Sequence, residues 1–441
     1  MKILGIETSC DETSASVVEN GEIILSNVII SQINLFSTYG GVIPEISARS
    51  HLEVILPVVQ KALKDANCTW DDINAIAVTH APGLLGSLLI GTLTARTLAI
   101  LHHKPLYAIH HLKSHIYANW LIKETSNTTN KTTPSSYHAT NIIEKKTITE
   151  PPSTYQYKHN ITKTHNISYK TLKEKPILPT FPLLALIISG GHTQIIKMTK
   201  HNHFEIIGTT LDDAIGECFD KVAKILGLPY PGGPAIAKTA KIGNPNKYHF
   251  PHPKVNQLNF SFSGLKTAVL RTIQKELALP ISHPSYDLKN HLNPQQIADF
   301  SASFQQTAID ILLEKLNLAL KQYPDTKSIV FAGGVSANEL LRKKVNNLFL
   351  YNTPTKIVLS SSTTIKNEPH PIYEHSSLKY HKNNTNQTSL HKNRPSVFFP
   401  KKSLSGDNAA MVATAAYYEI KSNIKATDPY KLNIYPRIPI S

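Results

Sequence analysis

The alternation of hydrophobic and polar positions repeats once along the chain. The first half begins with an apolar run at 3–6, a polar turn at 7–13 and a second apolar run at 15–18. The second half shows the same order, with the apolar run 183–188 followed by the polar turn 189–193. Short apolar runs bounded by turn residues indicate buried strands. The repeat predicts two related α/β units, each opening on a pair of strands.

Each half also contains a later strand that leads into a glycine-rich turn and a helix. The run 75–78 precedes the turn at 81–86, and the run 328–332 precedes the turn at 333–338. Glycine lets backbone N–H groups come close to a phosphate, and a helix N-terminus behind the turn favours negative charge. Paired in this way, the turns predict two lobes with a nucleotide between them. Ordinary tight turns of an α/β protein are the alternative.

Helical periodicity is clearest over 295–321, where Asn293 and Pro294 provide a cap and a first-turn proline. The range 45–65 has the same spacing of apolar residues, and 409–420 predicts a short closing helix. These elements fit between the predicted strands, as an α/β fold requires.

The chain therefore divides into two lobes, two inserts and a C-terminal segment. The predicted parts are an N-terminal lobe at 1–122 closed by a helix at 408–425, an insert at 123–176, a second lobe with a helical insertion at 177–359, an insert at 360–396, and a C-terminal segment at 397–441. The inserts are rich in Thr, Asn, Lys, Ser and His without apolar periodicity, which is typical of low-complexity loops. The preferred interpretation is that the sequence of these surface loops has drifted without a function. The functional alternative is that they are flexible arms that contact nucleic acid.

Charge adds a weak indication of the partner. The 441 residues carry a formal net charge of +15 with a pI near 9.4, which favours anionic partners such as nucleic acid or phosphorylated ligands. The two inserts account for +8 of this charge, so the remaining body carries only +7.

Cysteine usage and hydropathy bear on the compartment. Cys10, Cys68 and Cys218 are scattered and show no CxxC spacing, so neither a disulfide framework nor a zinc ribbon is predicted, consistent with a reducing compartment. The most apolar stretch, 84–100, is interrupted by glycines and by Arg96, which argues against a membrane span. The chain starts directly on its first predicted strand, with no signal-peptide pattern. A cytoplasmic enzyme without membrane contact is the expectation.

One group of residues has the composition of a metal site. His111 and His115 are spaced i, i+4, on one face of a helix. Asp407, at the start of the closing helix, is the best third ligand, and two His with one carboxylate suit iron or zinc with open positions. Two ordinary helix histidines are the alternative, since the chain has 21. Leu112 stands where an HExxH motif has its glutamate, which argues against a zinc peptidase.

Several short motifs run through both halves in one order: 1–13 (MKILGIETSCDET), 41–45 (GVIPE), 111–115 (HLKSH), 189–193 (SGGHT), 219–224 (FDKVAK), 230–234 (YPGGP), 262–267 (FSGLKT), 333–338 (GGVSAN) and 407–410 (DNAA). In this order they resemble the universal tRNA adenosine threonylcarbamoyltransferase family, formerly called O-sialoglycoprotein endopeptidase-like. The resemblance covers nearly the whole chain outside the inserts and is closer to bacterial and organellar members than to archaeal ones.

The resemblance implies the actin/hsp70/sugar-kinase fold, a duplicated two-lobed actin-like ATPase architecture. It implies that His111, His115 and Asp407 hold one divalent metal ion, Fe(II) ahead of Zn(II), with no other catalytic side chain assigned. The residues that it implies for binding threonylcarbamoyl-AMP are Ile187, Ile188, Ser189, Gly190, Gly191, Asp220, Gly233 and Asn338.

Some of these roles have plainer alternatives, and the chain departs from the family pattern at two positions. Asp220 is also interpretable as a helix-surface carboxylate, and Asn338 as a helix cap. Many relatives carry Asp where this chain has Ala237, which would weaken recognition of the ribose. Gly406 stands where Thr usually precedes the metal-binding Asp, which affects hydrogen-bond support of that carboxylate.

The implied reaction transfers a threonylcarbamoyl group from threonylcarbamoyl-AMP to N6 of the adenosine next to the anticodon, in tRNAs that read codons starting with A. The implied partners are the tRNA anticodon loop, a related actin-like dimerisation subunit, a P-loop ATPase subunit and an upstream synthase of threonylcarbamoyl-AMP. A non-catalytic nucleotide-binding scaffold of the same fold, a metallopeptidase and a sugar kinase are the alternatives.

Overall fold

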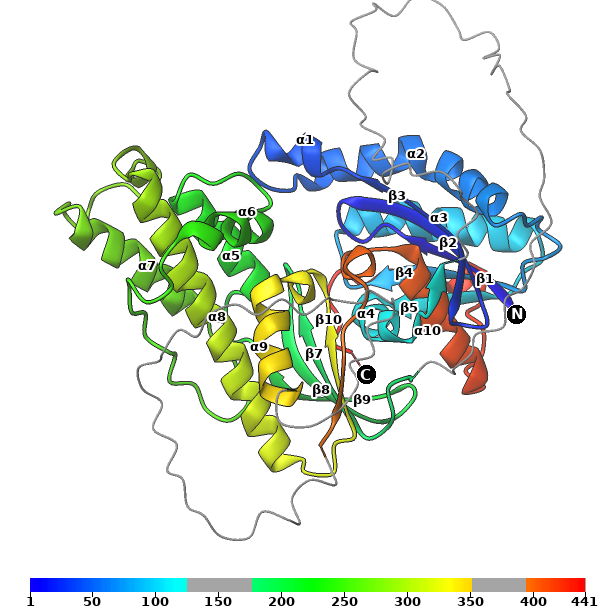
Figure 1. Cartoon of the computed structure of the whole chain (residues 1–441). Helices are drawn as coiled ribbons and strands as arrows, with labels where there is room; N and C mark the ends of the chain where they lie inside the picture. Colours follow the sequence, from blue (N-terminus) through cyan, green and yellow to red (C-terminus); the bar gives the residue numbers. More distant parts are fainter. Residues whose placement is uncertain (125–176, 351–393, 441) are drawn as a thin grey trace, which may run out of the picture.

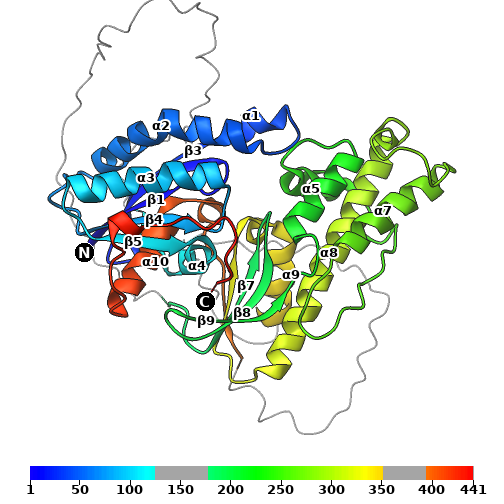
Figure 2. The same ribbon diagram turned by 180° about the vertical axis from the view of Figure 1, so that it is seen from behind.

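The computed structural model describes residues 1–124, 177–350 and 394–440. It shows two lobes, each built on one β-sheet, with helices stacked on the outer face of each sheet (Figures 1 and 2). The predicted inserts lie almost entirely outside the described residues. Lys123 and Glu124, at the start of the first, form a short strand, and Ser396, at the end of the second, begins another.

The first sheet has the strand order β5-β4-β1-β2-β3-β6. Its strands are β1 (Lys2–Glu7), β2 (Glu12–Glu19), β3 (Ile23–Ser31), β4 (Ala75–Ala81), β5 (Leu106–His110) and β6 (Lys123–Glu124). Strands β1, β2 and β3 form an antiparallel meander, and β4 and β5 continue the sheet parallel to β1.

The second sheet repeats this topology, with the order β11-β10-β7-β8-β9. Its strands are β7 (Leu183–Ile188), β8 (Thr193–Lys200), β9 (His203–Thr209), β10 (Ser328–Ala332) and β11 (Ser396–Phe398). Again an antiparallel meander is followed by two strands parallel to its first member. The predicted duplicated, two-lobed α/β fold is confirmed.

Helices cover these sheets. Those of the first lobe are α1 (Ile33–Ser37), α2 (Pro44–Asp65), α3 (Leu85–Leu101), α4 (His111–Tyr117) and α10 (Ala409–Lys421). Those of the second lobe are α5 (Ile215–Ile225), α6 (Gly232–Thr239), α7 (Ser263–Glu276), α8 (Pro294–Gln322) and α9 (Glu339–Leu350). Helix α8 begins with a capping box formed by Asn293 and Gln296, as the Asn293–Pro294 pair predicted. The closing helix, Ala409–Lys421, matches the helical pattern at 409–420 within one residue and ends before 425, the wider bound predicted for the segment that closes the first lobe.

The apolar run at β7 is continuous because both faces of this strand are buried. Leu183, Ala185 and Ile187 face a core that also contains residues of the first sheet, α4 and α10. Leu184 and Leu186 face the opposite core, which α5, α7 and α8 share. Side chains of a strand alternate between its faces, so one apolar segment contributes to two cores.

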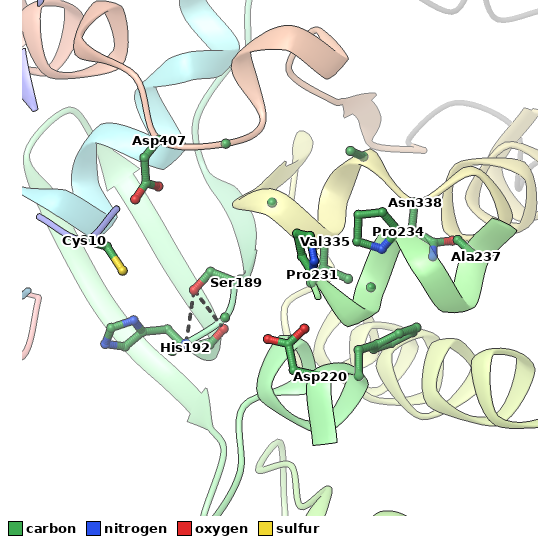
Figure 3. Close-up of a pocket in the computed structure, with 18 of the residues that line it drawn as sticks. Cys10, Ser189, His192, Asp220, Pro231, Pro234, Ala237, Val335, Asn338 and Asp407 are labelled. Atoms are coloured by element: carbon green, nitrogen blue, oxygen red, sulfur yellow. Dashed lines mark hydrogen bonds between the residues drawn. The ribbon is translucent and has the colours of Figure 1, made fainter. Parts of the chain in front are cut away.

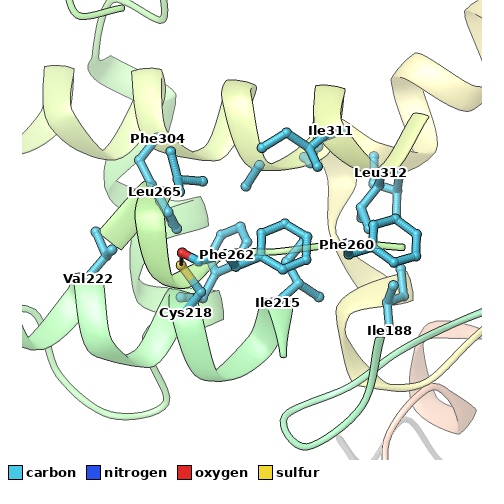
Figure 4. Packing of buried hydrophobic residues seen from close by; sticks show 14 of the residues in the cluster. Ile188, Ile215, Cys218, Val222, Phe260, Phe262, Leu265, Phe304, Ile311 and Leu312 are labelled. Carbon is cyan, nitrogen blue, oxygen red and sulfur yellow. Dashed lines mark hydrogen bonds between the residues drawn. The ribbon is translucent and has the colours of Figure 1, made fainter. Parts of the chain in front are cut away.

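The outer core of the second lobe is filled largely by aromatic and branched aliphatic side chains. Phe262, Phe304 and Ile215 are fully or almost fully buried there, together with Leu312 of α8 (Figure 4). Phe304 meets Phe219 edge to face, with ring centroids 4.9 Å apart, an arrangement that aromatic quadrupoles favour. This packing holds the helical layer that forms one wall of the interlobe space.

The turn between β8 and β9 joins the two lobes by polar contacts. Asn202 donates from Nδ2 to the Tyr418 carbonyl oxygen at 2.8 Å, and Tyr117 donates from its hydroxyl to Asn202 Oδ1 at 3.2 Å. Tyr117 and Tyr418 belong to α4 and α10 of the first lobe, so this turn fixes one edge of the interlobe space. Among the helices of the described residues, none is long and apolar enough to cross a membrane.

Replacing Glu419 by glutamine is expected to stabilise the protein above neutral pH. Glu419 on α10 is 8% exposed, and burial raises its pKa from 4.5 to about 7, although Lys113 lowers it in part. A carboxyl pKa that is higher in the folded state costs stability as pH rises from 4.5 through 7, by about 1–3 kcal/mol. Urea unfolding should therefore show the variant more stable near pH 8 and similar to the wild type near pH 4.5. The exposed Glu53→Gln control should change stability at neither pH; an equal effect of Glu419→Gln at both pH values would contradict the prediction.

Candidate metal and nucleotide site

The carboxyl ends of three neighbouring parallel strands of the first sheet place polar groups side by side. Glu7 ends β1, Thr79 lies near the end of β4, and His111 follows β5 as the first residue of α4. Because β1, β4 and β5 are parallel neighbours, these residues meet at one edge of the sheet. Thr79 donates to Glu7 Oε2 at 2.5 Å, and His111 Nδ1 lies 3.2 Å from the same oxygen.

His111, His115 and Asp407 converge although they come from opposite ends of the chain. His115 Nε2 lies 3.1 Å from both His111 Nε2 and Asp407 Oδ1, and His111 Nε2 lies 3.5 Å from Asp407 Oδ1. Two nitrogens and one carboxylate oxygen thus surround one point, with the spacing that ligands of a single first-row metal ion have. The residues present fit a divalent ion with nitrogen and oxygen donors.

The electrostatics of this cluster favour a cation. Burial lowers the pKa of His111, but Asp407 and Glu7 raise it more, to about 9. Burial raises the pKa of Asp407, but His111 and His115 lower it more, to about 2. Burial likewise raises the pKa of Glu7, and His111 reverses this, so that the net pKa is lowered. The carboxylates of Glu7 and Asp407 therefore stabilise a positive charge on the imidazole between them. A metal ion can supply this charge when it displaces the imidazole proton.

Glu7 is placed to orient His111. Its Oε1 accepts from the Ser9 backbone N–H at 2.6 Å, and its Oε2 faces His111 Nδ1. A carboxylate at Nδ1 keeps the proton on that nitrogen and leaves Nε2 unprotonated, so that its lone pair can bind a metal ion shared with Asp407 and His115.

Replacing Glu7 by glutamine is expected to weaken the affinity for the metal about 10–100-fold, the usual effect of losing such a carboxylate partner. The amide would favour a proton on His111 Nε2, the nitrogen that faces the other ligands. The dissociation constant of a divalent ion, measured by titrating chelator-treated protein, should rise accordingly. Glu53→Gln, on the exposed face of α2, is the matched control. An unchanged dissociation constant would show that Glu7 does not orient His111.

His111 and Asp407 border a large cavity between the lobes, and the buried His115 contacts both of them. This cavity has a volume of about 1480 Å³ and is lined by both lobes, including His111, Asp407, Ser189 and Asp220. In Figure 3, Asp407 and Cys10 lie on one side of the space, and Asp220 and Asn338 lie across it. Its volume exceeds the range of ordinary small-molecule pockets, so a nucleotide with an attached acyl group fits with room for a second reactant.

Four glycines leave the main chain accessible from the cavity. A Cβ atom added at Gly190, Gly191, Gly233 or Gly334 would meet no atom within 4 Å, so these residues border open space. All four line the cavity. A phosphate can therefore come close to the main chain at the turn after β7, at the start of α6 and at the turn after β10.

The other residues implied for substrate binding differ in their surroundings. Ser189 lines the cavity and accepts from the His192 backbone N–H at 3.1 Å. Ile187 and Ile188 are fully buried in β7 and do not line it, so they position the turn that follows them.

Asp220 and Asn338 line the cavity and also hold secondary structure. Asp220 Oδ1 accepts from Gly232 N at 2.7 Å at the start of α6, and burial raises the pKa of this carboxyl. Asn338 Oδ1 accepts from the backbone N–H groups of Leu340 and Leu341, and so caps α9. The plainer alternative, a helix cap, therefore holds for Asn338 beside any contact with substrate.

A sequence model of the tRNA N6-adenosine threonylcarbamoyltransferase (TsaD) family matches residues 23–130 and 159–364. The chain belongs to this family. The tRNA N6-adenosine threonylcarbamoyltransferase of Thermomicrobium roseum is 36% identical over 100% of this chain and 97% of its own length. That of Bacillus subtilis is 40% identical over 81% of this chain and 85% of its own. Among solved structures, the activator of the 2-hydroxyisocaproyl-CoA dehydratase from Clostridium difficile aligns with 96% of this chain and 97% of its own, at 11% identity and a TM-score of 0.43.

The site of this threonylcarbamoyltransferase-family chain includes residues to which the sequence alone gave no role. Glu7 faces His111, while Cys10, Asp11, Glu12 and His192 line the cavity. Burial and its neighbours His111 and His115 lower the pKa of His192 to about 4, so this imidazole is neutral at pH 7. The available signal was local: Glu7, Asp11 and Glu12 end or follow the buried run 3–6. The pairing of β1 with β4 and of β4 with β5, which brings this edge of the sheet to the histidines, belongs to the tertiary structure.

Proposed function

We propose that this chain transfers the threonylcarbamoyl group of threonylcarbamoyl-AMP to N6 of the adenosine next to the anticodon, in tRNAs that read codons starting with A. Membership of the threonylcarbamoyltransferase family supports an enzyme of this kind. The observation that carries the proposal is the position of His111, His115 and Asp407 at the side of an interlobe cavity that opens to glycine backbone. A nucleotide phosphate and a Lewis-acid site would thus share one space.

His111, His115 and Asp407 would hold one divalent ion. We propose Fe(II) ahead of Zn(II), because two imidazoles and one carboxylate with open positions are a common Fe(II) ligand set. When bound, the ion would polarise the carbamoyl carbonyl and offset charge on the departing phosphate. Glu7 would keep His111 in the tautomer that this requires.

The chain's own groups supply binding and orientation. Gly190, Gly191 and Gly334 allow the phosphate to reach the main chain, where N–H donors stabilise charge as AMP leaves. Asp220 lies across the cavity from Asp407, where it would accept from ribose hydroxyls (Figure 3). The acceptor adenosine is a single-stranded loop base, which a cavity of this width can admit.

The geometry does not favour a covalent enzyme intermediate at Ser9. Its hydroxyl lies 3.2 Å from His111 Nδ1, but Glu7 approaches the same nitrogen at 3.2 Å. A Ser–His–acid triad needs the nucleophile and the acid on opposite ring nitrogens. We therefore propose direct attack by the adenosine amine on the carbonyl carbon of the donor, with AMP as leaving group and loss of one proton from the amine.

The peptidase alternative lacks its base. Leu112 occupies the position of the HExxH glutamate and is buried. Family membership likewise favours the transferase over the scaffold and the sugar kinase.

A nucleoside analysis tests the proposed reaction. The purified protein, synthetic threonylcarbamoyl-AMP, Fe(II) and an unmodified tRNA that reads A-starting codons are incubated, and the digested nucleosides are analysed by mass spectrometry. Threonylcarbamoyl-adenosine is the expected product. The matched control is the same tRNA with guanosine in place of the acceptor adenosine, which should give none. Absence of product even with partner subunits added would overturn the proposal.

Partners and location extend the same proposal. An actin-like dimerisation subunit, a P-loop ATPase subunit, the tRNA anticodon loop and an upstream synthase of threonylcarbamoyl-AMP would complete the system, as the family resemblance implies. We also propose a cytoplasmic location, where tRNA and the adenylate would both be available. Cys10, Cys68 and Cys218 are free thiols, which agrees with a reducing compartment.

A further inference from the structure

The connection between α7 and α8 carries a second group of side chains that can ligate a metal. His283, Asp287 and His291 each offer one ligand atom, and these atoms lie within 4.8 Å of one another. None of the three lines the interlobe cavity. The connection lies at the end of the second lobe that points away from the first lobe (Figures 1 and 2). The group is therefore separate from His111, His115 and Asp407.

The two imidazoles of this group face one carboxylate oxygen. Asp287 Oδ2 lies 2.8 Å from His283 Nε2 and 3.0 Å from His291 Nε2. The other oxygen, Oδ1, accepts from Asn290 Nδ2 at 2.8 Å, which fixes the rotation of the carboxylate. Two nitrogens and one oxygen thus point at a common position, while an outer hydrogen bond orients the oxygen ligand, as is usual at metal sites.

The backbone that carries these side chains is anchored in the protein core. Gln274 of α7 is buried and donates to the carbonyl oxygens of Ile281 and His283, both at 3.1 Å. Leu288 is fully buried and Leu292 is 8% exposed. The ligands are therefore held close together by the fold, and little ordering entropy opposes binding of an ion.

We propose that His283, Asp287 and His291 form a second divalent-metal site that takes Zn²⁺. This donor set has the same composition as that of His111, His115 and Asp407. It also accepts Zn²⁺, with water completing the coordination, and at a partly exposed position outside the interlobe cavity we expect this redox-inert ion in place of Fe(II). Ca²⁺ and Mg²⁺ prefer oxygen ligands throughout, so this set discriminates against them.

The exposure of the ligands suits entry of an ion from solvent. The side chain of His291 is 43% exposed and that of His283 is 19% exposed. A bound ion would join the start of the connection to the turn that leads into α8 and so stabilise the helical layer of the second lobe.

Metal counting on the full chain tests this site. Chelator-treated protein is dialysed against Zn²⁺ alone, and bound zinc is measured by mass spectrometry. The double variant His283→Gln/His291→Gln should bind one equivalent less than the wild type, whatever the first site holds. Asp407→Ala reports separately on the first site, so a failure there leaves this comparison intact.

Three further measurements make the result specific. Asp287→Asn keeps the shape of the side chain and should also lose one equivalent. His252→Ala removes a surface histidine whose Nδ1 lies 2.9 Å from Glu314, and it should lose none. Zn²⁺ should raise the thermal unfolding temperature of the Asp407→Ala variant, and should not raise it when His283 and His291 are also replaced.

Equal zinc content in the wild type and in the His283→Gln/His291→Gln variant, with both proteins folded by circular dichroism, would overturn the proposal. The three residues would then be only a hydrogen-bonded Asp–His cluster.

Discussion

Replacing Asp407 by alanine is expected to lower threonylcarbamoyl transfer by more than about 100-fold, because loss of a direct ligand exceeds the 10–100-fold effect of losing an outer-shell partner. Asp407 is the carboxylate of the proposed ligand set, with its Oδ1 3.1 Å from His115 Nε2. Its removal also leaves His111 facing Glu7 alone, so the charge that favours a cation is halved. The rate of formation of threonylcarbamoyl-adenosine, measured with Fe(II) and saturating adenylate, checks this expectation.

The control for that measurement is Asp325→Ala, which removes an exposed carboxylate from the turn between α8 and β10. It should keep wild-type activity. Binding of AMP to the Asp407→Ala variant should persist, since the glycine turns remain. Full transfer activity in Asp407→Ala would contradict a role for the metal site in the mechanism. It would not contradict the transfer of the threonylcarbamoyl group itself.

Replacing Phe304 by alanine is expected to destabilise the second lobe by about 3–5 kcal/mol. Phe304 on α8 is fully buried and lies in edge-to-face contact with Phe219 of α5 (Figure 4). Truncation leaves a cavity between two helices that the surrounding side chains can fill only in part. The midpoint of urea unfolding should fall accordingly.

Leu318→Ala is the matched control on the same helix. Leu318 is 37% exposed, so its truncation should cost less than about 1 kcal/mol, in line with partial burial. A loss of less than about 1 kcal/mol for Phe304→Ala would mean that the α5–α8 contact is not part of the cooperative core.

The sequence alone was sufficient for the duplication and for the strands and helices with the clearest periodicity. The apolar runs 183–188 and 328–332 coincide with β7 and β10, and the pattern at 295–321 is within one residue of α8 at each end. Burial periodicity and capping are local properties, so they are legible in a linear sequence. The His111–His115 pair was found for the same reason, because an i, i+4 spacing on one helix requires no knowledge of the rest of the fold.

Other features were decided by packing between distant segments. Nothing near Glu7 in the sequence indicates that it faces His111; the parallel pairing of β1, β4 and β5 brings the two together. The sequence likewise could not separate the buried Ile187 and Ile188 from Ser189, which lines the cavity, since the family resemblance implied a binding role for all three. Which of them borders the cavity depends on where β7 ends between two cores.

The sequence by itself determined two α/β lobes, the helices at 45–65, 295–321 and 409–420, and the residue types present in the motifs, because propensity, periodicity and capping act over a few residues. Only the tertiary structure decided that Asp407 reaches the histidine pair. Helix α10 lies directly on β1 because Gly5 has no side chain; a Cβ there would collide with the carbonyl oxygen of Ala409. Asp407, two residues before that helix, is thereby held beside His115. The position of a ligand brought from the other end of the chain depends on this close approach, which no local pattern records.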